Sequence, residues 1–126
     1  ARLAVSPGDP ERFAYLRWRS VFAETCEARL VDIAVSRNGL IPAEAADLHT
    51  GLLGRRIERI ASQLPLQGWL CGDRFTMADV VAGYNLRLAV QTGLLERSAV
   101  EPYLGRLMAR PAARESRIFA SLPDAE

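Results

Sequence analysis

The sequence contains no lysine, a single histidine and only two cysteines among its 126 residues. All 16 basic residues are arginines, and the 15 acidic residues leave a formal net charge of +1. A domain that binds nucleic acid through its phosphates normally carries a clear basic excess. The charge balance therefore argues against nucleic acid as a partner.

Long hydrophobic runs and cysteine pairs are missing as well. The most apolar stretch, residues 77–90, contains charged side chains and is too short to cross a bilayer. The first residues lack the apolar core of a secretion signal, so we expect neither export nor membrane insertion. Cys26 and Cys71 lie far from each other and form no cluster with His49, which predicts no metal site and no disulfide. A cytoplasmic location fits best.

Apolar residues recur at spacings of three and four, which predicts an all-α fold. The length suits one domain with one core, spanning residues 1–126. We expect a five-helix bundle, followed by a loose tail from residue 121. The helices are expected at about residues 10–35, 42–64, 77–92, 102–110 and 112–120.

The first two expected helices are amphipathic and should pack antiparallel. Asp9 is the expected N-cap of the first helix, and an Arg-Asn-Gly turn at 37–39 should end it. Its expected buried stripe is Tyr15, Phe22, Cys26, Leu30 and Ile33. The expected buried face of the second helix is Ala45, Leu48, Leu52, Ile60 and Leu64. The third, at 77–92, is apolar around nearly its whole circumference, which predicts a central buried helix.

A capping motif opens this third helix. The Thr76 side chain can accept from the backbone N–H of Asp79, whose carboxylate can accept from the N–H of Thr76. Phe75 and Val80 have the spacing of a hydrophobic staple. Thr76 and Asp79 are expected scaffold residues, and Asp79→Ala is expected to cost on the order of 1–2 kcal/mol.

The capping motif lies within a longer segment that resembles a known protein domain. The segment LQGWLCGDRFTMADVVAGYNL at 66–86 and the later PYLGRLMARPAARES at 102–116 resemble the C-terminal all-helical domain of bacterial-type glutathione S-transferases. The segment GDPERFAYLRWRSVFAET at 8–25 looks like the first helix of that domain, so the resemblance covers essentially the whole chain.

The resemblance implies that this chain is one half of a two-domain transferase. In that family an N-terminal thioredoxin-like domain binds the co-substrate glutathione and engages its thiolate. This chain has no such domain, so no catalytic residue and no cofactor are assigned to it, and we expect it to be inactive alone. Its helical domain would supply the wall for a small hydrophobic electrophile, largely from its first helix and its C-terminal region, and half of a homodimer interface, formed by the first two helices.

The matching stretch of the first helix gives the candidate substrate-binding residues Tyr15, Trp18, Arg19 and Phe22. The helical wheel places Arg19 on the buried stripe, where it would need an anionic partner. Arg19 could face glutathione, the co-substrate or the neighbouring subunit; it could also form an internal ion pair or extend to the surface. The three aromatic residues could line a pocket or belong to the core or an interface.

Other interpretations remain open. His49 is expected to be an interface or helix residue rather than a general base, because no catalytic partner stands at a suitable spacing. A non-catalytic protein–protein interaction module is the alternative function, since similar helical domains occur in translation factors and tRNA-synthetase assemblies. A ligand-binding domain of a transcription regulator is a weaker option.

Overall fold

The structure, a computed structural model, describes residues 2–122, and this part of the chain is α-helical without a β-strand. The all-α expectation is confirmed. Between residues 2 and 122 only two isolated β-bridges occur, both in the loop at 69–74. The elements are α1 (Arg12–Ser20), the π-helical η1 (Val21–Glu27), α2 (Ala28–Arg37), α3 (Ala43–Ser62), α4 (Met77–Gln91), the 3₁₀ turn η2 (Arg97–Val100), α5 (Tyr103–Ala109) and α6 (Pro111–Ser116).

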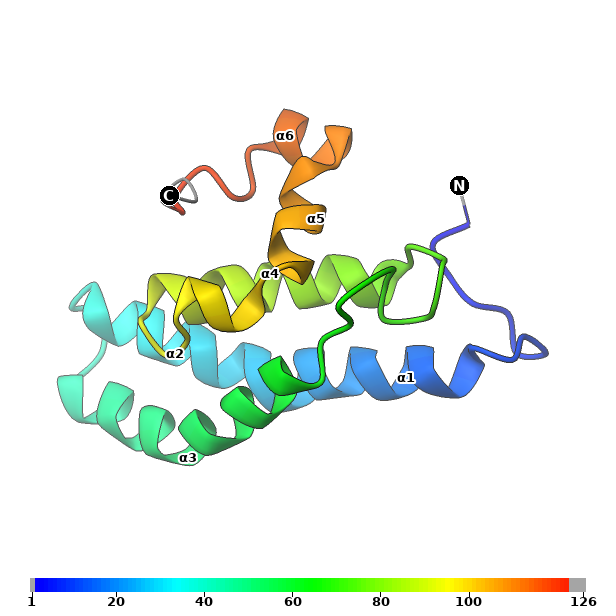
Figure 1. The fold of residues 1–126 in the computed structure, drawn as a ribbon. Coiled ribbons are helices and arrows are strands. Elements are labelled where there is room, and N and C mark those ends of the chain that lie inside the picture. The colour runs from blue at the N-terminus through cyan, green and yellow to red at the C-terminus, as the bar shows by residue number, and fades with distance from the viewer. Residues whose placement is uncertain (1, 123–126) are drawn as a thin grey trace.

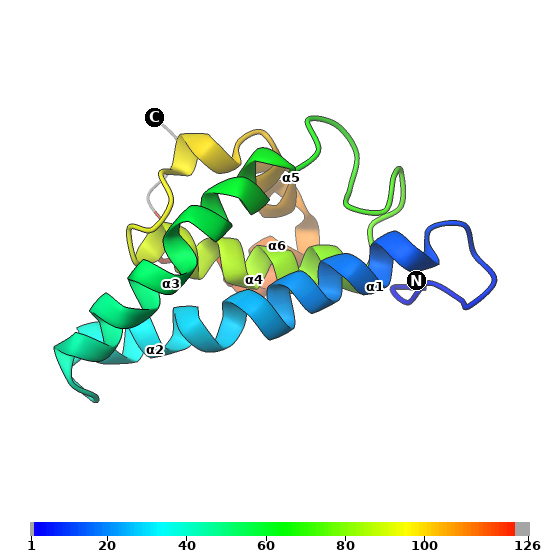
Figure 2. The same ribbon diagram turned by 90° about the horizontal axis from the view of Figure 1, so that it is seen from below.

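Helix α4 occupies the centre of the described fold. The elements α1, η1 and α2 form one continuous rod, and α3 packs back against α2 (Figures 1 and 2). Helix α4 lies along this rod, and α5 and α6 cover its other side (Figure 1). Eight of its residues are buried, from Ala78 to Ala89, so the expected central position is confirmed.

The first helix begins later than expected. It starts at Arg12, and Asp9 does not cap it. The Asp9 carboxylate instead accepts hydrogen bonds from the Ser6 backbone N–H at 3.0 Å and from the Arg74 guanidinium at 3.2 Å. These two interactions lower the pKa of Asp9, the Ser6 bond being the larger cause. The carboxylate therefore stabilises the turn that precedes the helix.

The predicted stripe of the first helix is confirmed, and it crosses the π-helical segment. Tyr15, Phe22, Cys26, Leu30 and Ile33 are all at most 3% exposed. From Phe22 to Leu30 the stripe advances by steps of four residues, and each such step drifts by about 40° around an α-helix. The wider turn of η1 reduces this drift. Phe22 and Leu30 can therefore face the same core.

The predicted buried face of α3 is largely wrong. Leu48 and Leu52 are 60% and 54% exposed, and Ala45 and Leu64 are only partly buried. The buried residues are Leu53, Ile57, Ile60 and Ala61, of which only Ile60 was expected. Leu52 and Leu53 are neighbours about 100° apart, so the sequence offered two apolar faces. The contact with α2 selects the one that contains Leu53 and Ile57.

The C-terminal helices are shorter than the sequence indicates. Helix α6 ends at Ser116 rather than near residue 120, because Arg117 adopts a left-handed conformation with φ of 56°. The turn η2 was not expected. The expected loose tail lies mostly in residues 123–126, outside the described part of the chain.

Candidate functional site

The N-terminus of α4 is closed by the predicted capping box. The Thr76 backbone N–H donates to Asp79 Oδ2 at 2.9 Å, as expected. The Thr76 hydroxyl oxygen accepts from the Ala78 N–H at 3.2 Å, whereas the Asp79 N–H, its expected donor, donates to the Thr76 backbone carbonyl at 3.0 Å. The Thr76 hydroxyl also donates to Asp79 Oδ2 at 3.3 Å. Thr76 and Asp79 are both fully buried. Their geometry thus fits the scaffold role expected for them.

The second oxygen of Asp79 joins two more distant segments, which the sequence did not reveal. Asp79 Oδ1 accepts from the Tyr103 hydroxyl at 2.7 Å and from the Leu70 backbone N–H at 3.0 Å. Burial, followed by the nearby charge of Asp79, raises the pKa of Tyr103 far above its ordinary value. Tyr103 therefore stays a neutral donor, and one carboxylate ties the loop at 69–74, α4 and α5 together.

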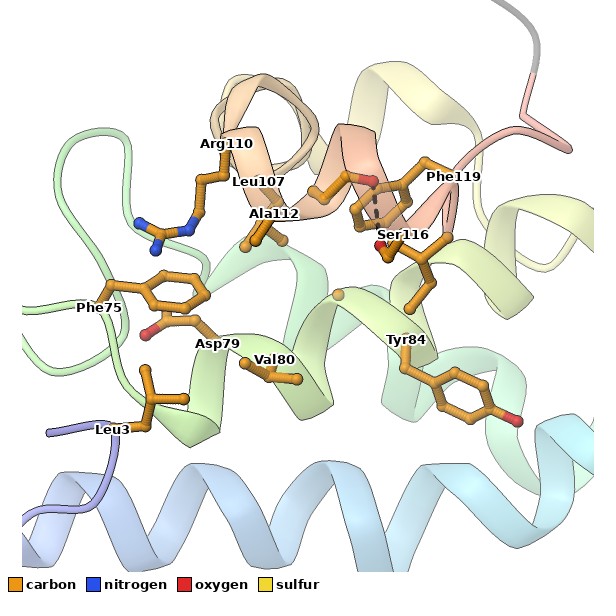
Figure 3. Close-up of a pocket in the computed structure, with 13 residues that line it drawn as sticks. Leu3, Phe75, Asp79, Val80, Tyr84, Leu107, Arg110, Ala112, Ser116 and Phe119 are labelled. Atoms are coloured by element: carbon orange, nitrogen blue, oxygen red, sulfur yellow. Dashed lines mark hydrogen bonds between the residues drawn. The ribbon is translucent and has the colours of Figure 1, made fainter. Parts of the chain in front are cut away.

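A cavity of about 490 Å³ opens beside this network, between α4 and the C-terminal helices (Figure 3). Leu3 reaches its edge, because the Met77 N–H donates to the Leu3 carbonyl at 2.8 Å. The lining is predominantly apolar. It comprises Leu3, Phe75, Asp79, Val80, Gly83, Tyr84, Leu107, Arg110, Ala112, Ala113, Ser116, Ile118 and Phe119.

One cation lies at an end of this cavity. The Arg110 guanidinium carbon is 3.5 Å from the ring centroid of Phe75 and 5.5 Å from that of Trp69. Figure 3 shows Arg110 and Phe75 at one end of the cavity and Phe119 at the other. The Asp79 carboxylate at the wall is already saturated with donors. The cavity thus offers apolar surface and one positive charge.

Phe75 and Val80, the expected hydrophobic staple, both line this cavity. The ring of Phe75 packs edge-on against Trp69, with centroids 4.9 Å apart. Val80 remains 39% exposed. Both side chains therefore contribute to the cavity wall, and the staple itself stays a prediction.

The candidate substrate-binding residues of the first helix lie elsewhere. Tyr15, Trp18 and Phe22 are buried in the core, and Trp18 stacks on Phe22 with centroids 5.9 Å apart. None of them lines the apolar cavity, although Trp18 lines a smaller one of about 220 Å³. A role in binding substrate stays a prediction for them.

Arg19 is not on the buried stripe, and that expectation is wrong. Its side chain is exposed, and its guanidinium carbon lies 5.5 Å from the ring centroid of Tyr15. A long side chain at the edge of an apolar stripe can cover an aromatic ring while its charge reaches water. Arg19 therefore needs no buried anion.

The histidine and the cysteines have ordinary structural surroundings. His49 Nε2 lies 3.2 Å from Asp32 Oδ2, which links α3 to α2. Cys26 and Cys71 are free and buried, and burial raises the pKa of both thiols, that of Cys26 to about 11. Among residues 2–122 no three histidine, cysteine or acidic side chains gather as a metal site would require.

Comparison with known proteins gives no assignment. No protein-family model matches the chain, and no curated protein matches it either. Within residues 2–122, no helix has both the length and the apolar character needed to span a membrane.

Proposed function

We propose that this chain is the helical domain of a glutathione S-transferase-like protein and that the cavity beside α4 receives the apolar co-substrate. The cavity carries this proposal, because an apolar hollow of about 490 Å³ has the size of a small-molecule site. Its wall from Leu107 to Phe119 belongs to the C-terminal region, from which the resemblance leads us to expect co-substrate contacts.

In this proposal the chain selects and positions the electrophile and does not activate the thiol. A thioredoxin-like domain in the full-length protein would bind glutathione and stabilise its thiolate, which attacks the electrophilic carbon. Holding the electrophile beside the thiolate lowers the entropic barrier to that attack. Within the described residues, the Tyr103 hydroxyl is committed to Asp79 and both thiols are buried. We therefore expect no transferase activity from this chain alone.

A binding measurement on the chain itself tests the cavity. The probe is 1-anilinonaphthalene-8-sulfonate, whose rings suit the apolar lining and whose sulfonate suits Arg110. Val80→Glu introduces a charge into the wall and is expected to weaken binding at least tenfold. Leu40→Glu, on an exposed leucine outside the cavity and outside α1 and α3, is the matched control and should leave binding unchanged. Equal affinity in all three proteins would disprove the site.

The transferase assignment has a separate test. A longer protein that includes the proposed thioredoxin-like domain should be retained on immobilised glutathione, whereas this chain alone should pass through. If the longer protein passes through as well, the transferase assignment is wrong and the non-catalytic interaction module is favoured.

The exposed apolar residues of α3 favour a protein–protein contact, which both candidate functions require. Leu48 and Leu52 stand one turn apart, and Phe13 and Leu16 are exposed on α1. We propose a homodimer in the full-length protein, in which these two helices form the contact. Light scattering should give a dimer mass, and Leu52→Glu should give a monomer mass.

The free thiols are consistent with the cytoplasmic location that we propose.

A further inference from the structure

A second cavity lies between the first helix and α3, and it shares no lining residue with the apolar cavity of the proposed function. Its volume is about 220 Å³. Three arginines and no acidic residue line it. The lining residues, which we call the arginine cleft, are Arg17, Trp18, Val21, Thr25, Arg56, Arg59, Ile60 and Gln63.

The arginine cleft arises from two helical rows that face each other. Arg56, Arg59 and Gln63 follow one face of α3 at steps of three and four residues. Arg17, Val21 and Thr25 follow α1 and η1 at steps of four, with the buried Trp18 beside them. The Arg17 Nη2 donates to Gln63 Oε1 at 2.9 Å and so links the two rows.

The three positive charges of the cleft have no anionic partner within the described residues. Neither Arg56 nor Arg59 makes a side-chain hydrogen bond or an ion pair there, and Arg17 contacts only neutral groups, Gln63 and the ring of Trp18 at 4.8 Å. Like charges held around one hollow repel each other. An anion bound between the three guanidinium groups would be attracted to each of them and would offset their mutual repulsion.

We propose that the arginine cleft binds a phosphate dianion, free or as the head of a small phosphomonoester. Each guanidinium presents a planar fork of N–H donors that matches phosphate oxygens. The Thr25 hydroxyl can add a further donor, and Val21 and Ile60 provide apolar surface for the body of an ester. Three cations match a doubly charged phosphate better than a singly charged carboxylate.

Tryptophan fluorescence can follow binding. Trp69→Phe leaves Trp18 as the sole tryptophan, and the contact with Arg17 makes Trp18 sensitive to movement of that guanidinium. Inorganic phosphate, phenyl phosphate and acetate are titrated at constant ionic strength, with calorimetry on the unaltered chain as a second readout. We expect saturable binding of both phosphates and none of acetate. Tighter binding of phenyl phosphate would identify an ester as the better ligand, and equal binding would identify the free ion.

Arginine variants locate the site. Arg56→Gln and Arg59→Gln should each weaken phosphate binding about tenfold, as expected for the loss of a charged hydrogen bond. Arg55→Gln is the matched control, because it removes the same charge from the same helix outside the cleft, and it should leave binding unchanged. Unchanged thermal unfolding would show that the variants are folded.

The opposite results overturn the proposal. The proposal is wrong if phosphate shows no saturable binding. It is also wrong if Arg55→Gln and Arg56→Gln lose phosphate affinity equally, because that would indicate a general effect of charge. If phosphate fails to bind and Arg56→Gln instead abolishes the dimer, the arginines face a second copy of the chain. The result of the phosphate titrations does not depend on the naphthalene sulfonate and glutathione experiments, because those experiments test other parts of the protein.

Discussion

Replacing Asp79 by alanine should be far more damaging than the loss of an ordinary helix cap. The substitution removes the acceptor for two backbone N–H groups, of Thr76 and Leu70, and for the hydroxyl of Tyr103. The Thr76 hydroxyl also loses Asp79 Oδ2 but keeps Cys71 Sγ, at 3.6 Å, as an acceptor. These residues are at most 7% exposed, so in the native fold bulk water does not reach their donor groups.

The magnitude follows from the number of donors. A buried donor that loses its partner costs about 1–3 kcal/mol. Three such donors lower the free energy of unfolding by about 3–5 kcal/mol, because water that enters the space left by the carboxylate can satisfy part of them. A cap alone is worth about 1 kcal/mol. A domain of this size is stable by about 5–15 kcal/mol, so the variant should fold with a much lower stability.

Urea denaturation measures the effect. With an m-value of about 1–3 kcal/mol/M, the midpoint should fall by about 2 M. Asp73→Ala, which alters an exposed carboxylate in the neighbouring loop, is the control and should change stability by less than about 0.5 kcal/mol.

A double-mutant cycle tests the role of Tyr103. Tyr103→Phe alone should cost about 1–2 kcal/mol. In the Asp79→Ala background the same change should cost nothing or stabilise, because it removes an unpaired hydroxyl. Additive effects, or a loss of only about 1–2 kcal/mol in Asp79→Ala, as for an ordinary cap, would refute the reasoning.

Three further predictions concern packing, backbone and pH. Leu53→Ala should lower the free energy of unfolding by about 2–5 kcal/mol, and Leu52→Ala by less than about 0.5 kcal/mol, in urea titrations. Gly68→Ala should lower the free energy of unfolding by about 1–3 kcal/mol, because φ of Gly68 is +67° and the new Cβ would lie 2.8 Å from the Gly72 carbonyl oxygen. Gly51→Ala is the control and should not destabilise, because no atom lies within 4 Å of its new Cβ. The unfolded chain loses the Cys26 proton near pH 9.0 and the folded chain near pH 11, so the free energy of unfolding should fall across this interval. This contribution should be missing in Cys26→Ala, and the native thiol should resist Ellman's reagent at pH 8.

Features that depend on near neighbours in the sequence were predictable. Both halves of the capping box lie within four residues, and the stripe from Tyr15 to Ile33 follows from helical spacing alone. Tyr103, by contrast, lies 24 residues from Asp79. A tyrosine at that distance carries no local signal that it will donate to this carboxylate.

Features that depend on the choice of a partner surface could not be read from the sequence. The face of α3 is set by its packing on α2, which the adjacent Leu52 and Leu53 leave undecided. The apolar cavity requires α4 and α6 to be placed first. The arginine cleft likewise appears only when α1 and α3 stand opposite each other.

The π-helical turn at Val21–Glu27 gives the first helix a place where its length can vary. A π-turn holds one residue more than an α-turn, so deletion of Ala23 could tighten it without rotating α1 against α2. Deletion of Ala14 within α1 would instead turn the preceding residues by about 100°. We expect cooperative unfolding to survive the first deletion better than the second, measured by thermal melting. This turn is thus where an insertion or deletion in the lineage of this chain would disturb the bundle least.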